Sequence, residues 1–536
     1  MSLDAALHAV LDARSSDADR VALHAEGRSW TRRQLREAID LASARLRSAW
    51  GVRPGDRVAY LGANRSEELV LLFALARIGA VFAPLNTRLA APELAAIVAH
   101  AQLHALVADT AHRDAGVAAL ALARDLVSSP AHAAANGEET QRQVFIQARI
   151  HAIDALLADD GMAPACDDDF EEVEDGAPLL LAYTSGTTGA PKGALHTHRG
   201  MLANASASIA AHAMREEDRV LTVLPLFHVG GLCIQTLPAL LAGAQVVLHP
   251  RFDAGTWLAA IADMRPTQTL MVPATLRAAI AHTTWFATDL SCLRSIMAGS
   301  SIIPRALIDA VHARGVPLGQ IYGSTETGPV TIVLKAEDAL HKPGFAGWPC
   351  FERSVRVVDD AGVEVQGGGV GEILVRAPNV MRGYWRESNA EGFRDGWFAT
   401  GDLARRDGDG CIEVVGRSRD LIISGGENVY PAELEDVLLA IDGIAEAAVV
   451  GVPDERWGEV PAAFVVRVSG EDSAMLDEAT VAAAFDARLA RFKHPAHIVF
   501  VDRLPRNAMG KVQAHLLRES LPARPSARSS ASESQG

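Results

Sequence analysis

Residues 183–193 read Tyr183-Thr184-Ser185-Gly186-Thr187-Thr188-Gly189-Ala190-Pro191-Lys192-Gly193, and this loop decides how the rest of the sequence is interpreted. An apolar run at 178–182 precedes it, so we expect the loop to leave a buried strand. Glycines let the backbone turn and approach a ligand closely. Hydroxyl and backbone N–H groups can then point at phosphate oxygens. The pattern predicts a phosphate-binding loop in which Lys192 supplies a compact positive charge.

Two alternative interpretations of this loop fit its residues less well. A Walker A loop needs GxxxxGK followed by Ser or Thr, whereas here Pro191 precedes Lys192 and Gly193 follows it. A glycine-rich turn without a ligand would not need hydroxyl residues and a lysine interleaved with its glycines. The loop therefore indicates a phosphate site of a different type.

Size and composition limit the possible domain number and the classes of function. The chain has 536 residues, which predicts two to four folding units. It is 49% hydrophobic and 22% charged, as is typical of a globular protein. The net charge of −16 argues against a general nucleic-acid-binding protein, which would need a basic face.

Cysteine usage and hydropathy favour a soluble cytoplasmic protein. The five cysteines form no CxxC pair and are expected to be reduced thiols. The N-terminus lacks the pattern of a signal peptide. The most apolar stretch, residues 69–85, contains Arg77, Gly79 and Pro84 and is too short to span a bilayer. We expect it to form a buried helix followed by a buried strand.

The order of patterns along the chain predicts the fold. Helical patterns alternate with short apolar runs over residues 29–240, which is typical of an α/β fold with largely parallel strands. Beyond residue 344 the pattern changes to β with glycine turns, and from 421 strands and helices alternate again. We therefore predict a large N-terminal domain of mixed sheets with packed helices plus a β-rich subdomain, and a small mobile α+β C-terminal domain. The boundaries are 1–416 for the large domain, with a helical insertion at about 110–165, 417–420 for a hinge, 421–521 for the small domain and 522–536 for a disordered tail.

Three further motifs carry chemistry. Residues 321–328, Ile321-Tyr322-Gly323-Ser324-Thr325-Glu326-Thr327-Gly328, end a predicted strand, where α/β folds place ligands. A carboxylate beside a phosphate site is a natural Mg²⁺ ligand. In residues 397–403, Asp402 suits the two hydroxyls of a ribose. Glycines at 425 and 426 precede a helix and predict a turn or a close approach of the backbone.

These motifs, with Lys511 in the loop 505–512, resemble those of the adenylate-forming superfamily in their order along the chain. The resemblance covers residues 3–517 and lies with the acyl-CoA synthetases. It implies an acid–thiol ligase that converts an acid, ATP and coenzyme A into acyl-CoA, AMP and pyrophosphate through an acyl-adenylate. ATP, Mg²⁺ and coenzyme A are the cofactors that it implies.

The resemblance also assigns roles to residues. Glu326 and Thr188 would bind the metal, Asp420 would be the hinge between domains, and Lys511 would bridge the carboxylate and the α-phosphate. The implied catalytic residues are Lys511, Thr325, Glu326, Lys192 and His228. The residues implied to hold ATP or coenzyme A are Thr184, Ser185, Gly186, Thr187, Thr188, Gly189, Lys192, Gly299, Ser300, Ser301, Tyr322, Gly323, Ser324, Thr325, Asp402, Arg417, Gly425, Gly426 and Lys511. Many members of the superfamily carry glycine where this chain has Ser300, and lysine where it has Arg419.

Residues 224–231 resemble the segment that lines the acyl pocket, with His228 as an aromatic gate between the acid and coenzyme A. The implied pocket residues are His228, Val229, Gly230, Val272, Pro273, Gly299, Gly323 and Val330. None of them supplies a cation for a second carboxylate. We therefore expect an uncharged acid, either aryl or a medium-chain to long-chain fatty acid.

Other functions stay open at this point. The enzyme could deliver its acyl-AMP to a carrier protein, or carry out an oxidation of the luciferase type. A non-catalytic acyl-nucleotide-binding protein would be expected to lose Lys511, Glu326 or Asp402, and this chain retains all three. The expected partners are a small carboxylic acid and coenzyme A, without nucleic acid or an integral membrane segment, and a homodimer is left open.

Overall fold

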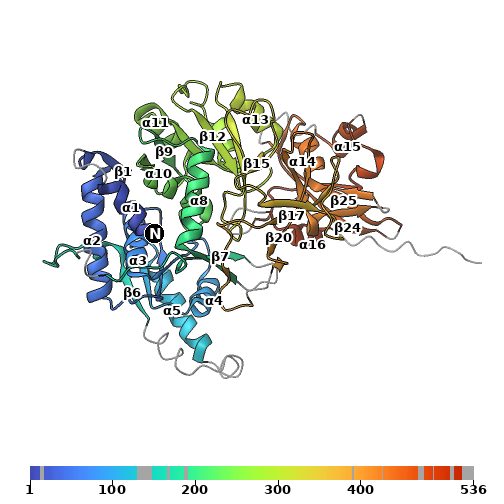
Figure 1. The fold of residues 1–536 in the computed structure, drawn as a ribbon. Coiled ribbons are helices and arrows are strands. Elements are labelled where there is room, and N and C mark those ends of the chain that lie inside the picture. The colour runs from blue at the N-terminus through green and yellow to red at the C-terminus, as the bar shows by residue number, and fades with distance from the viewer. Residues whose placement is uncertain are drawn as a thin grey trace, which may run out of the picture. The chain divides into compact units, whose positions relative to one another are not determined.

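The computed structural model describes residues 1–12, 17–128, 148–165, 170–185, 191–388, 392–424, 427–454, 456–468, 476–486, 488–506 and 512–521. The chain divides into two compact units, Met1–Val414 and Val415–Gly536 (Figure 1). The hinge proposed at 417–420 falls at the start of the second unit, and the tail proposed at 522–536 lies outside the described residues.

The first unit contains a nine-stranded sheet in its described part, with the order β15-β14-β13-β12-β11-β9-β10-β1-β2. The strands from β13 to β1 pair in parallel, and antiparallel strands extend both edges. The parallel carboxyl ends therefore meet at one edge, where the candidate site residues were expected. The bounds are β1 Val21–Ala25, β2 Arg28–Thr31, β9 Arg219–Thr222, β10 Gln245–Leu248, β11 Gln268–Met271, β12 Ser295–Gly299, β13 Leu318–Tyr322, β14 Ile332–Leu334 and β15 Trp348–Pro349.

A second, seven-stranded sheet of this unit has the order β18-β8-β7-β4-β3-β5-β6. Its strands from β7 to β6 are parallel, whereas β8 pairs antiparallel with both β7 and β18. The phosphate loop therefore joins two antiparallel strands. The bounds are β3 Arg57–Leu61, β4 Val81–Pro84, β5 Ala105–Ala108, β6 Arg149–Ala152, β7 Pro178–Ser185, β8 Pro191–Thr197 and β18 Gly383–Tyr384.

Helix α3, Ser66–Ile78, shows why this stretch was so apolar in the sequence. Nearly all of its side chains are buried, in a core that also takes residues from strands of both sheets. A helix that is apolar all round must be enclosed on every side. Gly79 ends the helix with a φ of 78°, and the fully buried strand β4 follows. The expected buried helix and buried strand are both confirmed.

The other helices of the first unit cover the two sheets (Figure 1). Within the segment predicted as a helical insertion, the described residues form α5, the edge strand β6 and the short helix η2. The segment thus contributes a sheet strand as well as a helix. The bounds are α1 Leu3–Asp12, α2 Arg32–Ser48, α4 Ala91–Ala101, α5 Arg113–Ser128, η2 Ile153–Leu157, α8 His198–Ala211, α9 Val229–Gly231, η4 Leu232–Thr236, α10 Leu237–Leu241, α11 Ala254–Met264, α12 Pro273–Ile280 and α13 Arg305–His312.

A third sheet of the first unit is antiparallel, with the order β16-β17-β20-β19. It is the β-rich subdomain that the glycine turns beyond residue 344 predicted. Its strands are β16 Val355–Val358, β17 Gly371–Val375, β19 Phe393–Arg394 and β20 Trp397–Arg406. Strand β21, Ile412–Arg417, then runs across the division between the two units.

The second unit packs helices against a sheet with the order β23-β22-β25-β24, in which β26 also pairs with β25. It has a hydrophobic core of its own around Leu434, Val465 and Phe485. The elements are η5 Ser418–Asp420, β22 Ile422–Ser424, β23 Glu427–Val429, α14 Pro431–Leu439, β24 Ile444–Asp454, β25 Gly458–Arg467, α15 Glu478–Asp486, η7 Arg491–Lys493, β26 His497–Phe500 and α16 Ala514–Ser520. This is the mixed α and β composition that the sequence predicted.

No helix in the described ranges is long and apolar enough to cross a membrane. The cysteines at positions 233, 292, 350 and 411 are all free thiols.

Three buried histidines, on β8, on α8 and directly after α8, make the fold sensitive to acid. Burial lowers the pKa of His196, His198 and His212 from 6.5 to about 4. The Nδ1 atom of His198 also accepts a hydrogen bond from the Leu3 N–H at 3.1 Å, which requires a neutral ring. Between pH 6.5 and 4 the unfolded chain therefore binds protons that the folded chain excludes, so stability falls as the pH falls. We expect a loss of roughly 2 kcal/mol for each fully buried histidine by pH 5.

Urea unfolding at pH 7.5, 6 and 5 measures this loss. His196→Met removes one titrating group and should flatten the pH dependence, whereas His341→Gln, at an exposed histidine, should leave it unchanged. Equal pH dependence in the wild type and in His196→Met would contradict the assignment to buried histidines.

Candidate functional site

The predicted phosphate loop is held by the hairpin of β7 and β8. Thr184 pairs with Lys192 and Ser185 with Pro191, so the two strands run to the ends of the loop. The loop residues Gly186, Thr187, Thr188 and Gly189 lie outside the described residues. The expectation that the loop leaves a buried strand is confirmed, because residues 179–182 of β7 are all buried.

Lys192 and Glu326 are brought together around one tyrosine. The Tyr384 hydroxyl donates a hydrogen bond to Oε1 of Glu326 at 3.0 Å. The ammonium nitrogen of Lys192 lies 5.1 Å from the centre of the Tyr384 ring. It also lies 4.0 Å from a carboxylate oxygen of Glu387. The proposed phosphate-binding cation and the proposed metal-binding carboxylate therefore share one tyrosine.

Backbone pairing fixes Tyr384 in this position. Strand β18 pairs with β8, so that Tyr384 stands opposite Ala194, two residues after Lys192. The Met381 N–H donates to the Glu326 carbonyl at 2.8 Å. Sequence reasoning did not find Tyr384, since an isolated tyrosine in a two-residue strand carries no motif.

Tyr322 and Asp402, two of the residues implied to hold ATP or coenzyme A, are also brought together. The Tyr322 hydroxyl donates to Oδ2 of Asp402 at 2.8 Å, although 80 residues separate them. Asp402 is 6% exposed. Its backbone N–H donates to the Thr400 hydroxyl, which donates in turn to the Ile373 carbonyl. The carboxylate is thus anchored to β17, beside the aromatic ring at the end of β13.

Two glycines permit close backbone approach at the ends of neighbouring parallel strands. A Cβ atom at Gly299, the last residue of β12, would lie 2.5 Å from the Ile321 carbonyl oxygen. A Cβ atom at Gly323, just after β13, would lie 2.2 Å from the Pro329 carbonyl oxygen. Only glycine leaves both backbones in place. Beyond Gly323, the Ser324 N–H donates to the Thr327 hydroxyl at 2.9 Å, and these two residues enclose Thr325 and Glu326.

Ser300 occupies a position that favours glycine. Its φ is 76°, whereas the neighbouring Ser301 is not in the left-handed region. A residue with a Cβ atom is strained in this conformation, whereas glycine adopts it without strain. We expect Ser300→Gly to stabilise the protein by roughly 0.5–1 kcal/mol. Ser301→Gly is the matched control and should destabilise it by a similar amount. Thermal unfolding of both variants tests this, and a lower midpoint for Ser300→Gly would contradict it.

The proposed acyl pocket gathers at the end of β9. Val272 and Val330 belong to one apolar cluster together with Leu224 and Ile234. A Cβ atom at Gly230 would meet no atom within 4 Å, so this glycine faces open space. His228 directly precedes α9 and makes an edge contact with Phe227, their ring centres 4.5 Å apart. Val229 is half-buried in α9, and Pro273 is the first residue of α12, directly after Val272.

Asn64 fixes the loop that leads to His228. Its side-chain N–H groups donate to the carbonyls of Leu224 and His249, each at 3.0 Å, and its Oδ1 accepts from the Leu226 N–H at 2.9 Å. Asn64 follows β3 of the seven-stranded sheet, whereas Leu224 and His249 follow strands of the nine-stranded sheet. One buried amide therefore joins the two sheets beside the acyl pocket.

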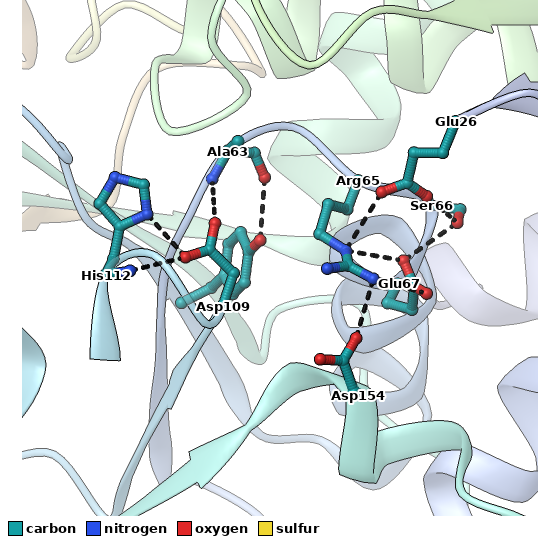
Figure 2. A network of polar contacts seen from close by, with 9 residues as sticks. Glu26, Ala63, Arg65, Ser66, Glu67, Asp109, His112 and Asp154 are labelled. Carbon is teal, nitrogen blue, oxygen red and sulfur yellow. Dashed lines mark hydrogen bonds and ion pairs between the residues drawn. The ribbon is translucent and has the colours of Figure 1, made fainter. Parts of the chain in front are cut away.

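Figure 2 shows the polar contacts of Ala63 and Arg65, the two residues that flank Asn64 in the sequence. On one side, the Asp109 carboxylate accepts hydrogen bonds from the Ala63 N–H, at 2.9 Å, and from His112. The Tyr60 hydroxyl donates a hydrogen bond to the Ala63 carbonyl. On the other side, Arg65 forms ion pairs with Glu26, Glu67 and Asp154. The turn at 63–65 is thus fixed at each flank of Asn64. Its role could not be found from sequence, because the partners lie about 160 and 185 residues away.

The candidate residues of the second unit are described only in part. Arg417 ends β21 and Asp420 ends η5. Gly425 and Gly426 lie outside the described residues, between the paired strands β22 and β23. Lys511 also lies outside them, between Arg506 and Val512, which form an antiparallel bridge.

The described side chains could bind Mg²⁺ only together with phosphate oxygens of a bound substrate. Within the described ranges, no group of three or more His, Cys, Asp or Glu side chains could hold a metal ion. Mg²⁺ is usually held by one or two carboxylates together with substrate phosphates. Glu326, with Tyr384 orienting one of its carboxylate oxygens, suits that mode of binding.

Comparisons with known proteins match most of this chain. The model of the family "AMP-binding enzyme" matches residues 12–385, and that of the "AMP-binding enzyme C-terminal domain" matches residues 433–511. An indoleacetate–CoA ligase from Aromatoleum aromaticum is 46% identical over 488 residues, which cover 91% of this chain and 92% of the relative. A feruloyl-CoA synthase from an Amycolatopsis species is 40% identical, with 91% and 93% covered. The solved structure of o-succinylbenzoate coenzyme A synthetase from Bacillus subtilis, in complex with ATP and magnesium ion, has a TM-score of 0.77 and 31% identity, with 95% of this chain and 99% of that chain covered.

Proposed function

Because the chain belongs to the AMP-binding enzyme family, we propose that it is an ATP-dependent acid–CoA ligase that acts on aryl-substituted carboxylic acids. Ligation of an aryl or fatty acid to coenzyme A through an acyl-adenylate is the activity that its relatives share. The narrower choice of aryl acids rests on one observation. Two relatives named for aryl acids match this chain over nine-tenths of its length, at 46% and 40% identity.

The pocket supports an uncharged aryl group. Val272 and Val330 belong to one apolar cluster, and a Cβ atom at Gly230 would meet no atom within 4 Å. Apolar side chains around the acid favour a flat apolar ring. A second charged group on the acid would be unfavourable there, because a buried charge needs an oppositely charged partner.

In the first half-reaction, a carboxylate oxygen of the acid attacks the α-phosphorus of ATP. The bond from that phosphorus to the bridging oxygen breaks, and pyrophosphate leaves with the electron pair. Lys192 and Lys511 would offset the negative charge gathered on the phosphate oxygens. Asp402 would accept hydrogen bonds from the ribose, and Tyr322 would stack on the adenine. Glu326 and Thr188 would hold Mg²⁺, whose charge would offset that of the phosphates.

In the second half-reaction, the sulfur of coenzyme A attacks the carbonyl carbon of the acyl-adenylate. The bond from that carbon to the phosphate oxygen breaks, and AMP leaves. His228 would separate the acid from the thiol as a gate. The glycines at 425 and 426 would line the channel for the pantetheine arm, after a rotation of the small domain about Asp420.

Acid-dependent pyrophosphate release tests this proposal. The panel contains aryl, short, medium and long-chain acids, each with ATP and Mg²⁺, with and without coenzyme A. Release with aryl acids, and acyl-CoA only when coenzyme A is added, is the expected result. Acid-dependent release without a thioester would move the acceptor to a carrier protein. No release over the whole panel, from a folded protein that binds ATP, would favour a non-catalytic binding protein.

A further inference from the structure

One glutamine beside the acyl pocket has unmet hydrogen-bonding capacity. Gln235 lies on η4, a π-helical turn, and is 2% exposed. Neither its amide oxygen nor its amide nitrogen has a hydrogen-bond partner in the part of the chain that the structure describes. Buried amides are nearly always paired, so an unpaired one indicates a partner that is yet to bind.

A small hollow lies against this side chain. Besides Gln235, its lining includes Leu224, Gly231 and Leu270. It has room for about one water-sized group. A single oxygen or a ring N–H could enter this hollow, whereas a whole aromatic ring could not.

The other polar side chains that line the hollow are already paired. The hydroxyls of Thr222 and Thr236 are hydrogen-bonded to each other at 2.8 Å, and the Thr236 hydroxyl donates to the Gly231 carbonyl at 2.7 Å. Among the described side chains that line this hollow, Gln235 therefore has the hydrogen-bonding groups without a partner.

The hollow adjoins the proposed acyl pocket. Leu224 and Leu270 line it, and both belong to the same apolar cluster as Val272 and Val330. Gly231 also lies at its edge, one residue after Gly230, which faces open space. A ring resting against the valines could thus direct one substituent toward Gln235.

We propose that Gln235 is a specificity-determining residue that hydrogen-bonds a hydroxyl or ring N–H of the bound aryl acid. This inference rests on the proposed function and narrows its substrate class to aryl acids with such a group. The amide can accept from an N–H, or both donate to and accept from a hydroxyl. A site built for such a group rejects the analogue that lacks it, because the amide then stays buried without a partner. The alternative is that the hollow holds a bound water molecule that hydrogen-bonds only to protein groups.

Two pairs of acids separate these occupants. The first pair is 4-hydroxycinnamate and cinnamate, and the second is indole-3-acetate and benzothiophene-3-acetate. Rates of acyl-CoA formation are measured with the wild type and with Gln235→Met, which keeps the length of the side chain and removes the amide. For at least one pair, we expect the wild type to favour the hydrogen-bonding acid by about 100-fold or more in kcat/KM. Gln235→Met should lose that preference, with kcat/KM for the apolar partner kept within about threefold.

Thr236→Val is the matched control. It removes a polar group that lines the same hollow, but one that is already paired within the protein. It should affect both members of a pair equally. Gln235→Leu serves if Gln235→Met does not fold.

Three results would overturn the inference. In the first, the wild type has equal kcat/KM for both members of each pair. In the second, Gln235→Met loses kcat/KM equally for both members, and in the third the enzyme acts only on acids outside both pairs. Each leaves the proposed acid–CoA ligation intact, since acyl-CoA still forms, and activity on fatty acids alone would withdraw only the choice of aryl acids. The ligase proposal fails only when no acid of the panel yields a thioester.

Discussion

Lys511→Ala is expected to lower the rate of acid-dependent pyrophosphate release by about 100-fold to 1000-fold. Carboxylate and triphosphate repel each other, and the proposed role of Lys511 is to bridge them while charge builds up on the α-phosphate. The variant should still form acyl-CoA when it is supplied with a synthetic acyl-adenylate, because that step needs no cation between carboxylate and phosphate. Rapid-quench measurements of the two half-reactions make this comparison.

Lys493→Ala is the matched control for Lys511→Ala. Lys493 is a lysine of the same unit, and its ammonium group is held by the Glu433 carboxylate at 2.7 and 2.8 Å. Both half-reactions should proceed normally in this variant. Pyrophosphate release within about threefold of the wild type in Lys511→Ala would remove the lysine from the mechanism, and an equal loss in both half-reactions would indicate general damage to the second unit.

Gly323→Ala is expected to lower kcat/KM for ATP by about 100-fold or more and to lower the unfolding temperature. The added Cβ atom would lie 2.2, 2.5 and 2.9 Å from the carbonyl oxygen, carbonyl carbon and Cα of Pro329. All three are backbone atoms, so the loop that carries Thr325 and Glu326 must move. A displacement of about 1 Å in a catalytic group can cost about 100-fold in rate.

Gly176→Ala provides the comparison for this backbone effect. Its Cβ would meet nothing within 4 Å, and its φ is not in the left-handed region. This variant should match the wild type in steady-state kinetics and in calorimetry. Kinetics of Gly323→Ala that also match the wild type would show that the loop accommodates a methyl group and that Gly323 does not position the site.

The sequence predicted the parts of this molecule that local pattern controls. The apolar run before residue 183 predicted β7, and the strand expected to end at the 321–328 motif is β13. Because neighbouring parallel strands end at one edge of a sheet, the motifs after β12 and β13 had to lie close together. At Gly299 and Gly323 the loops carry backbone carbonyls too close for a side chain.

The sequence could not predict contacts that depend on chain segments far apart. Tyr384 reaches Glu326 because a two-residue strand pairs with β8. The hydrogen bond between Tyr322 and Asp402 joins two different sheets. Gln235 lies in an apolar stretch with helical spacing, and only the packing around it shows that its amide is left unpaired. In each case the contact depends on the register in which strands pair and on the direction of the side chain. A local sequence motif determines neither.

The position of Asn64 has a consequence for enzyme engineering. Libraries designed to change acid preference usually sample side chains that face the substrate. Asn64 faces the backbone of residues 224–226 instead, and the ion pairs and hydrogen bonds of Figure 2 hold the turn that presents it. We therefore expect substitutions at Asp109 or Arg65 to shift the wall of the proposed acyl pocket without altering any residue proposed to line it. A library for this enzyme should include the turn at 60–66, and selections for new acids should be expected to return changes there.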